Sequence, residues 1–307
     1  MVSLRVLFGL LPALGAAVPS AALRRDVSSP LLEEFNRFSQ YTAASNCLAN
    51  HNGSSAGSPV YCDAGFCPLI KEADTEIIKG FWGLSPGDTT GYLALDRTQK
   101  LIVLAFRGTV SDENGWTDLM LGYTDAATAC DGCKAHKGFW GASTAAMDNL
   151  TSTIDTAVAQ NSDYKLVVTG HSLGGAIATL AAVRLRNAGH TLDLYTFGAP
   201  SVGNLAFAQY ITDQGSGNNY RLTHGPDEVP KVLYKTSRHW LFHILVPEYS
   251  QSSPEYWITS GVGVSVAESD IKFIEGVNNE TGNLGTQEVT MAPHGWYMGN
   301  MSVCAQT

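Results

Sequence analysis

The chain has 307 residues, 44% of them hydrophobic, and a formal net charge of −9 at pH 7. This charge argues against nucleic acid or anionic lipid as the main partner, because both are negatively charged themselves. The length, without a low-complexity linker or a repeat, indicates one domain with a large core, as in an enzyme built on a central sheet.

The first residues have the pattern of a secretion signal. Arg5 supplies a positive charge, a short apolar stretch follows at 6–11, and small residues at 15–17 form a cleavage site. The apolar stretch is too short to anchor the chain in a bilayer, and no transmembrane run follows it. We therefore expect residues 1–17 to be a signal peptide.

A second processing site follows the signal. Residues 18–25 end in the dibasic pair Arg24-Arg25 and are interpreted as a propeptide, which leaves residues 26–307 as the secreted mature protein with no integral membrane segment. Sequons for N-glycosylation fit such a secreted surface. They begin at Asn52, Asn149, Asn279 and Asn300.

All six cysteines lie in the mature part, and an even number in an oxidising compartment predicts disulfides. Three bridges allow fifteen connectivities in principle. The CxxC pair lacks a second pair or histidine ligands, so we expect no metal site. Close spacing favours two short bridges and leaves a third to join the two ends of the domain: Cys62–Cys67, Cys130–Cys133 and Cys47–Cys304.

Hydrophobic periodicity predicts helices that alternate with strands. The expected helices are 30–45, 139–160, 176–186 and 205–211. The expected strands are 91–96 and 100–106, which form a hairpin, then 165–169, 192–198 and 219–224. This alternation indicates an α/β domain with helices on both faces of a sheet.

The most informative stretch is Gly-His-Ser-Leu-Gly at 170–174, between an expected strand and an expected helix. This context is that of a nucleophile elbow, in which a sharp strand-to-helix turn exposes a serine. The glycines on either side of Ser172 leave room for the turn, and Gly175 lets the helix pack close to the sheet. Ser172 is therefore the expected nucleophile, and His171 is interpreted as a packing residue.

A serine nucleophile needs a general base, and the base needs a group that orients it. In this type of fold they follow in the order Ser, Asp or Glu, His. Asp193 is expected inside a strand and Asp213 at a helix end, but Asp227 follows the carboxyl end of strand 219–224, where catalytic groups gather. Asp227 is the expected orienting group, with Glu228 as the weaker alternative.

Three histidines follow this aspartate in the chain. His239 and His243 share an apolar stretch and are interpreted as packing or pocket-wall residues, whereas His294 opens a short helical segment and is the expected base.

The tetrahedral intermediate also needs two donors aimed at its oxyanion. The expected donors are the N–H of Leu173, directly after the nucleophile, and Thr109, at the end of the strongest apolar run.

The chain resembles the filamentous-fungal class 3 lipases, the family of the Rhizomucor and Thermomyces lipases, which includes fungal feruloyl esterases. The similarity runs from about residue 38 to residue 304. The matching segments are 91–96, 105–109, 170–175, 197–200, 253–258 and the loop of His294. The resemblance implies an α/β-hydrolase fold in one domain, with a central, mostly parallel sheet and helices on both faces. It also implies a triad of Ser172, Asp227 and His294, the two oxyanion donors and the three disulfides.

The resemblance also implies a short lid after Thr109. Two departures from the family pattern affect the expected substrate preference. The lid stretch is more acidic and longer than the usual lipase lid, and the sequence at 108–112 is closer to that of the feruloyl esterases. The residues of the lid include Asp112, Glu113, Asn114, Trp116 and Asp118. The segment between Asp227 and Ser253 is also longer, and its apolar run at 240–246 would widen a lipid-facing surface.

We therefore expect a secreted serine carboxylic-ester hydrolase. The leading interpretation is a triacylglycerol lipase that hydrolyses acylglycerols through an acyl-enzyme at an oil–water interface. A feruloyl esterase or short-chain carboxylesterase is the alternative with the same chemistry. A non-catalytic lipid- or carbohydrate-binding relative would lack a triad residue, and this chain has all three. We expect no cofactor, metal ion or nucleic acid partner, and a monomer.

Overall fold

The computed structural model describes residues 27–51, 55–63, 65–108, 122–234 and 248–304. The expected signal peptide at 1–17 and propeptide at 18–25 lie outside these residues. Within the described part of the chain, no helix is long and apolar enough to cross a membrane.

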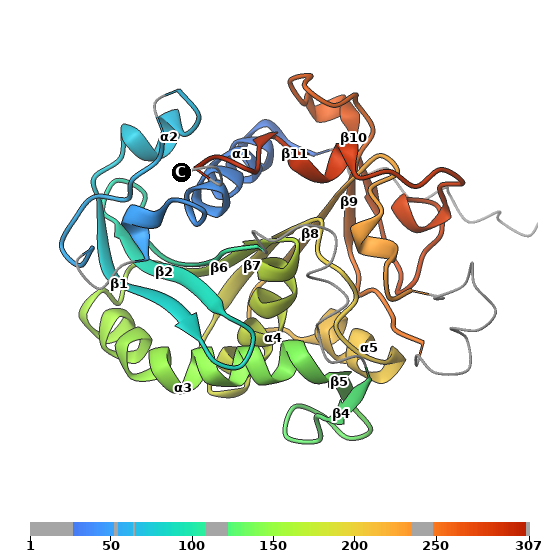
Figure 1. Cartoon of the computed structure of the whole chain (residues 1–307), viewed down its shortest axis with the longest axis horizontal. Coiled ribbons are helices and arrows are strands. Elements are labelled where there is room, and N and C mark those ends of the chain that lie inside the picture. Colours follow the sequence, from blue (N-terminus) through green and yellow to red (C-terminus); the bar gives the residue numbers. More distant parts are fainter. Residues whose placement is uncertain (1–26, 52–54, 64, 109–121, 235–247, 305–307) are drawn as a thin grey trace, which may run out of the picture.

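An eight-stranded sheet runs through the centre of the molecule, in the order β1-β2-β3-β6-β7-β8-β9-β10 (Figure 1). Its strands are β1 Thr75–Leu84, β2 Thr89–Asp96, β3 Leu101–Phe106, β6 Lys165–His171, β7 Leu192–Phe197, β8 Asn219–His224, β9 Glu255–Ile258 and β10 Ile271–Ile274. The pairs from β3 to β9 are parallel, and only β2 and β10 run against the others. The mostly parallel sheet predicted from the sequence is confirmed.

Helices cover both faces of this sheet (Figure 1). Helix α1 (Ser29–Ala44) packs on one face, and helices α3 (Lys137–Gln160) and α4 (Leu173–Asn187) pack on the other. Strand β3 shows why two cores form, since all six of its residues are buried and alternate ones face opposite sides. Ile102, Leu104 and Phe106 join the α3–α4 core, and the residues between them join the α1 core.

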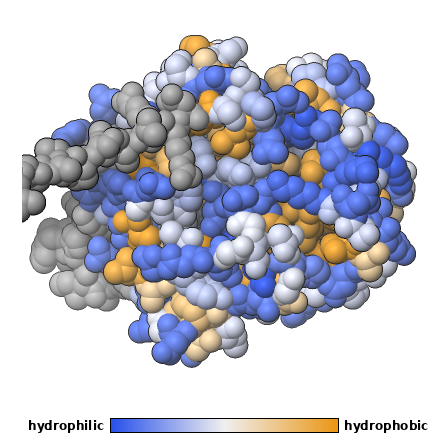
Figure 2. Space-filling view, turned by 180° about the vertical axis from the view of Figure 1, so that it is seen from behind, coloured by the Kyte–Doolittle hydropathy of each residue, from blue (hydrophilic) through white to orange (hydrophobic). Residues whose placement is uncertain are grey.

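The remaining elements are short. They are helices α2 (Pro68–Lys71) and α5 (Leu205–Asp213), the hairpins β4–β5 (Tyr123–Asp125, Lys134–His136) and β11–β12 (Trp296–Tyr297, Gly299–Asn300), and the 3-10 helices η1 (Leu48–Asn50), η3 (Val229–Lys231), η4 (Glu268–Asp270), η5 (Asn283–Gly285) and η6 (Ala292–Gly295). Polar residues cover most of the side seen in Figure 2, where hydrophobic residues form separate patches. The apolar residues thus gather mainly in the two cores.

Two details of the predicted elements were wrong. The helix expected from residue 176 begins at Leu173, because the elbow itself forms its first turn. Strands β1, β9 and β10 were not predicted. β1 is an edge strand with mixed polar and apolar residues, and β9 and β10 have four residues each, so none shows a clear period.

The three expected disulfides are present: Cys47–Cys304, Cys62–Cys67 and Cys130–Cys133. The first joins the segment after α1 to the C-terminal end of the described chain, across 257 positions. Of the described cysteines, none is free.

Replacing Cys47 and Cys304 with alanine should lower the melting temperature more than replacing Cys130 and Cys133. The first bridge spans 257 positions and the second only 3. The chain-entropy model assigns about 5 kcal/mol to a loop of a few hundred residues and less than about 3 kcal/mol to one under 15. Calorimetry of the two double variants measures the difference. Equal losses, or peptide mapping that shows other pairs, would refute this assignment.

Candidate active site

Ser172 stands at the turn between β6 and α4, with φ +57° and ψ −129°. A positive φ is costly for a residue with a side chain and persists where the surroundings force it. The flanking glycines allow the chain to pack closely around this turn: a methyl group at Gly170 would lie 2.3 Å from the carbonyl oxygen of Gly174, and one at Gly174 would lie 2.4 Å from that of Phe106. The sharp strand-to-helix turn expected at Ser172 is present.

Asp227 and His294 are in direct contact, although 67 positions separate them. Nδ1 of His294 lies 2.9 Å from Oδ2 of Asp227. Asp227 follows β8 in a tight turn and is fully buried, and His294 lies in η6 with 8% of its surface exposed. Because a carboxylate only accepts hydrogen bonds, Nδ1 carries the proton and Nε2 is left free to accept one, as a general base must.

Other donors fix the carboxylate of Asp227. The hydroxyl of Tyr297 donates to Oδ2, and the backbone N–H of Val229 donates to Oδ1 at 3.0 Å. Burial, and then the charge of Asp227, raise the pKa of Tyr297 well above its ordinary value, so its hydroxyl stays protonated and keeps donating. The carboxylate therefore has one orientation, which faces the ring of His294.

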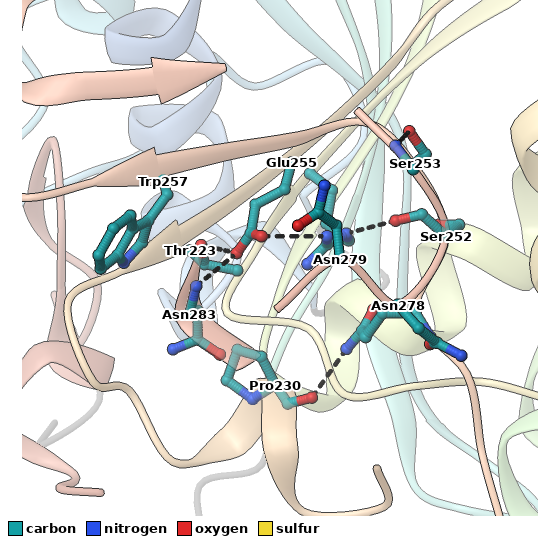
Figure 3. Close-up of polar contacts among 12 residues, drawn as sticks. Thr223, Pro230, Ser252, Ser253, Glu255, Trp257, Asn278, Asn279 and Asn283 are labelled. Carbon is teal, nitrogen blue, oxygen red and sulfur yellow. Dashed lines mark hydrogen bonds and ion pairs between the residues drawn. The ribbon is translucent and has the colours of Figure 1, made fainter. Parts of the chain in front are cut away.

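Thr223, Glu255 and Asn283 belong to a buried polar network (Figure 3), which supports the backbone of the Asp227 turn. The side-chain amide of Asn283 donates to the carbonyls of Asp227 (2.9 Å) and Gly225 (3.1 Å). The backbone N–H of Asn283 donates to Glu255 at 3.2 Å, and the hydroxyl of Thr223 donates to the same carboxylate oxygen. The network thus ties the turn to β8 and β9.

Glu255 is 1% exposed, and its charge needs a partner inside the protein. Nη2 of Arg221 lies 3.7 Å from Oε2 of Glu255. Burial lowers the pKa of Arg221 and the carboxylate of Glu255 opposes this shift, so each charge compensates the other.

Gly198 follows β7 with φ +59°, against the Asp227–His294 pair. A methyl group there would lie 2.9 Å from the hydroxyl of Tyr297 and 3.0 Å from both Oδ2 of Asp227 and Nδ1 of His294. Sequence reasoning did not identify Gly198 as a functional residue. The strand-end sequence Phe-Gly-Ala-Pro was visible, but the loops that meet there were not.

Replacing Gly198 with alanine should lower kcat by about 10–100-fold, because a displacement of 1 Å in a catalytic group costs about that much. The positive φ should also lower the melting temperature. Rates on a soluble ester and a thermal melt measure both effects. Gly215→Ala is the control, since no atom of the described part of the chain lies within 4 Å of a methyl group there. An unchanged kcat in Gly198→Ala would contradict the packing described.

Of the two expected oxyanion donors, the structure describes Leu173. It is the first residue of α4, and the N–H groups of a first helical turn have no acceptor within the helix. Thr109 lies outside the described residues, but its neighbour Gly108 does not. A methyl group at Gly108 would lie 3.6 Å from Cβ of Ser172, so the chain leading to Thr109 passes beside Ser172.

His171, interpreted from the sequence as packing, contacts the proposed base. Its Nε2 lies 2.8 Å from the carbonyl oxygen of His294, and the two ring centroids are 4.4 Å apart. Burial, and then the proximity of His294, lower the pKa of His171 well below its ordinary value. Its place directly before Ser172 was the one signal that could have pointed to this contact.

The aspartates rejected from the sequence lie elsewhere. Asp193 is buried in β7 and pairs with Lys165 at 2.5 Å, and Asp213 ends α5 with hydrogen bonds to Gln209. Glu228 is exposed and its side chain is not part of the pair with His294.

Several predicted residues fall outside the described part of the chain. They are Thr109, the lid residues Asp112, Glu113, Asn114, Trp116 and Asp118, the histidines His239 and His243, and the sequon at Asn52. The other sequons are described: Asn149 and Asn300 are exposed, and the side chain of Asn279 donates to Glu275 at 2.6 Å. Among the described residues, no cluster of three or more His, Cys, Asp or Glu side chains could hold a metal ion.

Several known proteins are similar to this chain in sequence and in fold. The family model for class 3 lipases matches residues 103–237, and that for the lipase 3 N-terminal region matches residues 7–78. A secreted mono- and diacylglycerol lipase A from Penicillium camembertii is 41% identical over 274 residues, covering 89% of this chain and 85% of that protein.

A secreted mono- and diacylglycerol lipase 1 from Fusarium solani is 35% identical and matches 91% of this chain and 79% of its own length. The crystal structure of a mono- and diacylglycerol lipase from Aspergillus oryzae aligns with a TM-score of 0.80 at 38% identity, over 89% of this chain and 98% of that one.

Proposed function

Since the chain belongs to the class 3 lipase family and has its α/β-hydrolase fold, we propose that it is a secreted acylglycerol lipase with Ser172, Asp227 and His294 as its catalytic triad. The observation that carries this proposal is the contact of Nδ1 of His294 with the buried carboxylate of Asp227. The contact lies at the carboxyl edge of the sheet, where the strained Ser172 also stands.

The geometry supports acyl transfer through a covalent intermediate. Oγ of Ser172 attacks the ester carbonyl while Nε2 of His294 accepts its proton and then delivers it to the departing glycerol oxygen. Asp227 holds the tautomer of His294 and stabilises the imidazolium that forms. A water molecule, deprotonated by His294, then attacks the acyl-enzyme and releases the fatty acid.

The developing oxyanion needs two donors in fixed positions. We propose the N–H of Leu173 as the first, because it begins α4 directly after the nucleophile. Thr109 is the proposed second donor, supported by the approach of Gly108 to Ser172. The lid after Thr109 also remains a proposal, which rests on the resemblance to lipases.

We propose mono- and diacylglycerols as substrates beside the triacylglycerol that the sequence indicated, because the similar Penicillium and Fusarium proteins are named mono- and diacylglycerol lipases. The test is a hydrolysis panel of monoolein, diolein, triolein, tributyrin and methyl ferulate. Glycerides should be hydrolysed faster than methyl ferulate, and the partial glycerides fastest. The variant Ser172→Ala, purified in the same way, measures any contaminating hydrolase.

Two outcomes of this panel would change the proposal. If methyl ferulate is hydrolysed faster than every glyceride, the protein is an esterase of the same family. If triolein is hydrolysed faster than monoolein and diolein, the preference for partial glycerides is wrong and the triacylglycerol lipase stands.

The proposal includes secretion and processing. The similar proteins are named as secreted, so we propose a signal peptide at 1–17, a propeptide at 18–25 and a mature enzyme of 26–307. We propose a monomer, because one chain supplies all three triad residues. N-terminal sequencing of the secreted protein should begin at Asp26, and a start before Arg24 would exclude dibasic cleavage.

A further inference from the structure

His171 is the last residue of β6 and directly precedes Ser172. The centroid of its ring lies 4.4 Å from that of His294, with 34° between the planes, and 5.8 Å from that of Tyr297. On another side, a methyl group at Gly108 would lie 3.7 Å from Nδ1 of His171. The side chain of His171 therefore lies against the proposed base, against Tyr297, which donates to Asp227, and beside the segment that leads to Thr109.

The polar contact of His171 defines its protonation. Nε2 lies 2.8 Å from the carbonyl oxygen of His294, and a carbonyl oxygen only accepts. Nε2 of His171 therefore carries a proton. Burial and the neighbouring His294 both disfavour a second proton, which leaves the ring uncharged.

We propose that His171 is a positioning residue for His294. Its Nε2–H holds the backbone carbonyl of His294, and its uncharged ring packs against the imidazole of the same residue. The inference rests on the proposed function, which takes His294 as the general base. These two contacts fix both the backbone and the ring plane of His294. In this proposal they orient Nε2 of His294 toward the hydroxyl of Ser172.

The absence of charge on His171 is part of this role. His294 becomes an imidazolium each time it accepts a proton from Ser172. A cation 4.4 Å away, in a site shielded from water, would oppose that step. The role thus requires a hydrogen-bond donor without a positive charge, which neutral histidine supplies.

The test compares three variants on p-nitrophenyl butyrate below its solubility limit, where interfacial effects do not enter. His171→Gln keeps an uncharged donor, His171→Leu removes the donor, and His171→Lys keeps a donor but adds a charge. We expect kcat to fall by less than about tenfold in His171→Gln and by about 30–100-fold in His171→Leu. The lysine variant should fall further than the leucine variant, with KM within about twofold in all three.

Two controls separate positioning from folding. A p-nitrophenyl phosphonate titrates the fraction of chains with a reactive serine, and kcat is calculated per titrated site. His190→Gln is the matched control, since His190 pairs with Asp155 at 2.9 Å away from this site. It should keep the wild-type kcat.

The proposal is overturned if His171→Leu keeps kcat per titrated site within threefold of the wild type, or if lysine is tolerated as well as glutamine. Ser172→Ala and His294→Ala are measured in the same series. If these two retain activity, the proposed function fails. If they abolish activity while the His171 variants match the wild type, the positioning role alone fails.

Discussion

Replacing Ser172 with alanine should reduce kcat by about 10⁶-fold, as when a serine nucleophile is removed from a comparable triad. The residue is 5% exposed and its side chain makes no cap hydrogen bond to α4, so the substitution removes the nucleophile and little else. Alanine must adopt the same φ of +57° as serine, so the substitution adds no new backbone strain and the fold should be kept. Initial rates on tributyrin and a circular-dichroism melt measure activity and fold together.

A matched control exists in α3. Ser143 is also buried, and its hydroxyl has no hydrogen-bond partner among the residues that the structure describes, so Ser143→Ala likewise removes a buried serine oxygen. It should leave kcat unchanged. Activity of Ser172→Ala within tenfold of the wild type would exclude Ser172 as the nucleophile.

Replacing Asp227 with asparagine should reduce kcat by about 10⁴-fold. Oδ2 of Asp227 accepts from both Nδ1 of His294 and the hydroxyl of Tyr297, and Oδ1 accepts from the N–H of Val229. An amide group that donates toward His294 favours the wrong tautomer, in which Nε2 carries the proton and cannot accept one from Ser172. Single-turnover and steady-state rates on a soluble ester measure the loss, which should appear in kcat rather than in KM.

Asp193 provides the comparison for this variant. It is buried in β7 and paired with Lys165, but it has no contact with His294. Asp193→Asn should therefore lower the melting temperature and leave kcat near the wild-type value. If both variants lose activity equally, the special role of Asp227 is refuted.

The three residues of the proposed triad could be selected from the sequence because each carries a local signal. Ser172 lies between glycines whose spacing defines the turn, and Asp227 follows directly on a strand that periodicity identifies. The short helical segment marked His294. Local sequence also predicted the central parallel strands, since these are buried on both faces and read as continuous apolar runs.

What could not be predicted depends on contacts between distant segments. His171 meets the carbonyl of a residue 123 positions away, and Asn283 supports the Asp227 turn from 56 positions away. Gly198 must lack a side chain because two segments approach it, the Asp227 turn and the segment that carries His294 and Tyr297. The neighbouring residues do not reveal these distant partners, even where a local signal exists, such as the place of His171 directly before Ser172. Sequence reasoning therefore assigned His171 to packing and did not assign the other two.

We propose Ser172, activated by the Asp227–His294 pair, as the nucleophile. Covalent labelling tests it most directly: the mature enzyme is treated with a p-nitrophenyl alkylphosphonate and its peptides are analysed by mass spectrometry. We expect one phosphonyl group per chain, carried by Ser172, with simultaneous loss of ester hydrolysis and no labelling of Ser172→Ala. A label on another residue, or full activity after Ser172 is labelled, would contradict it.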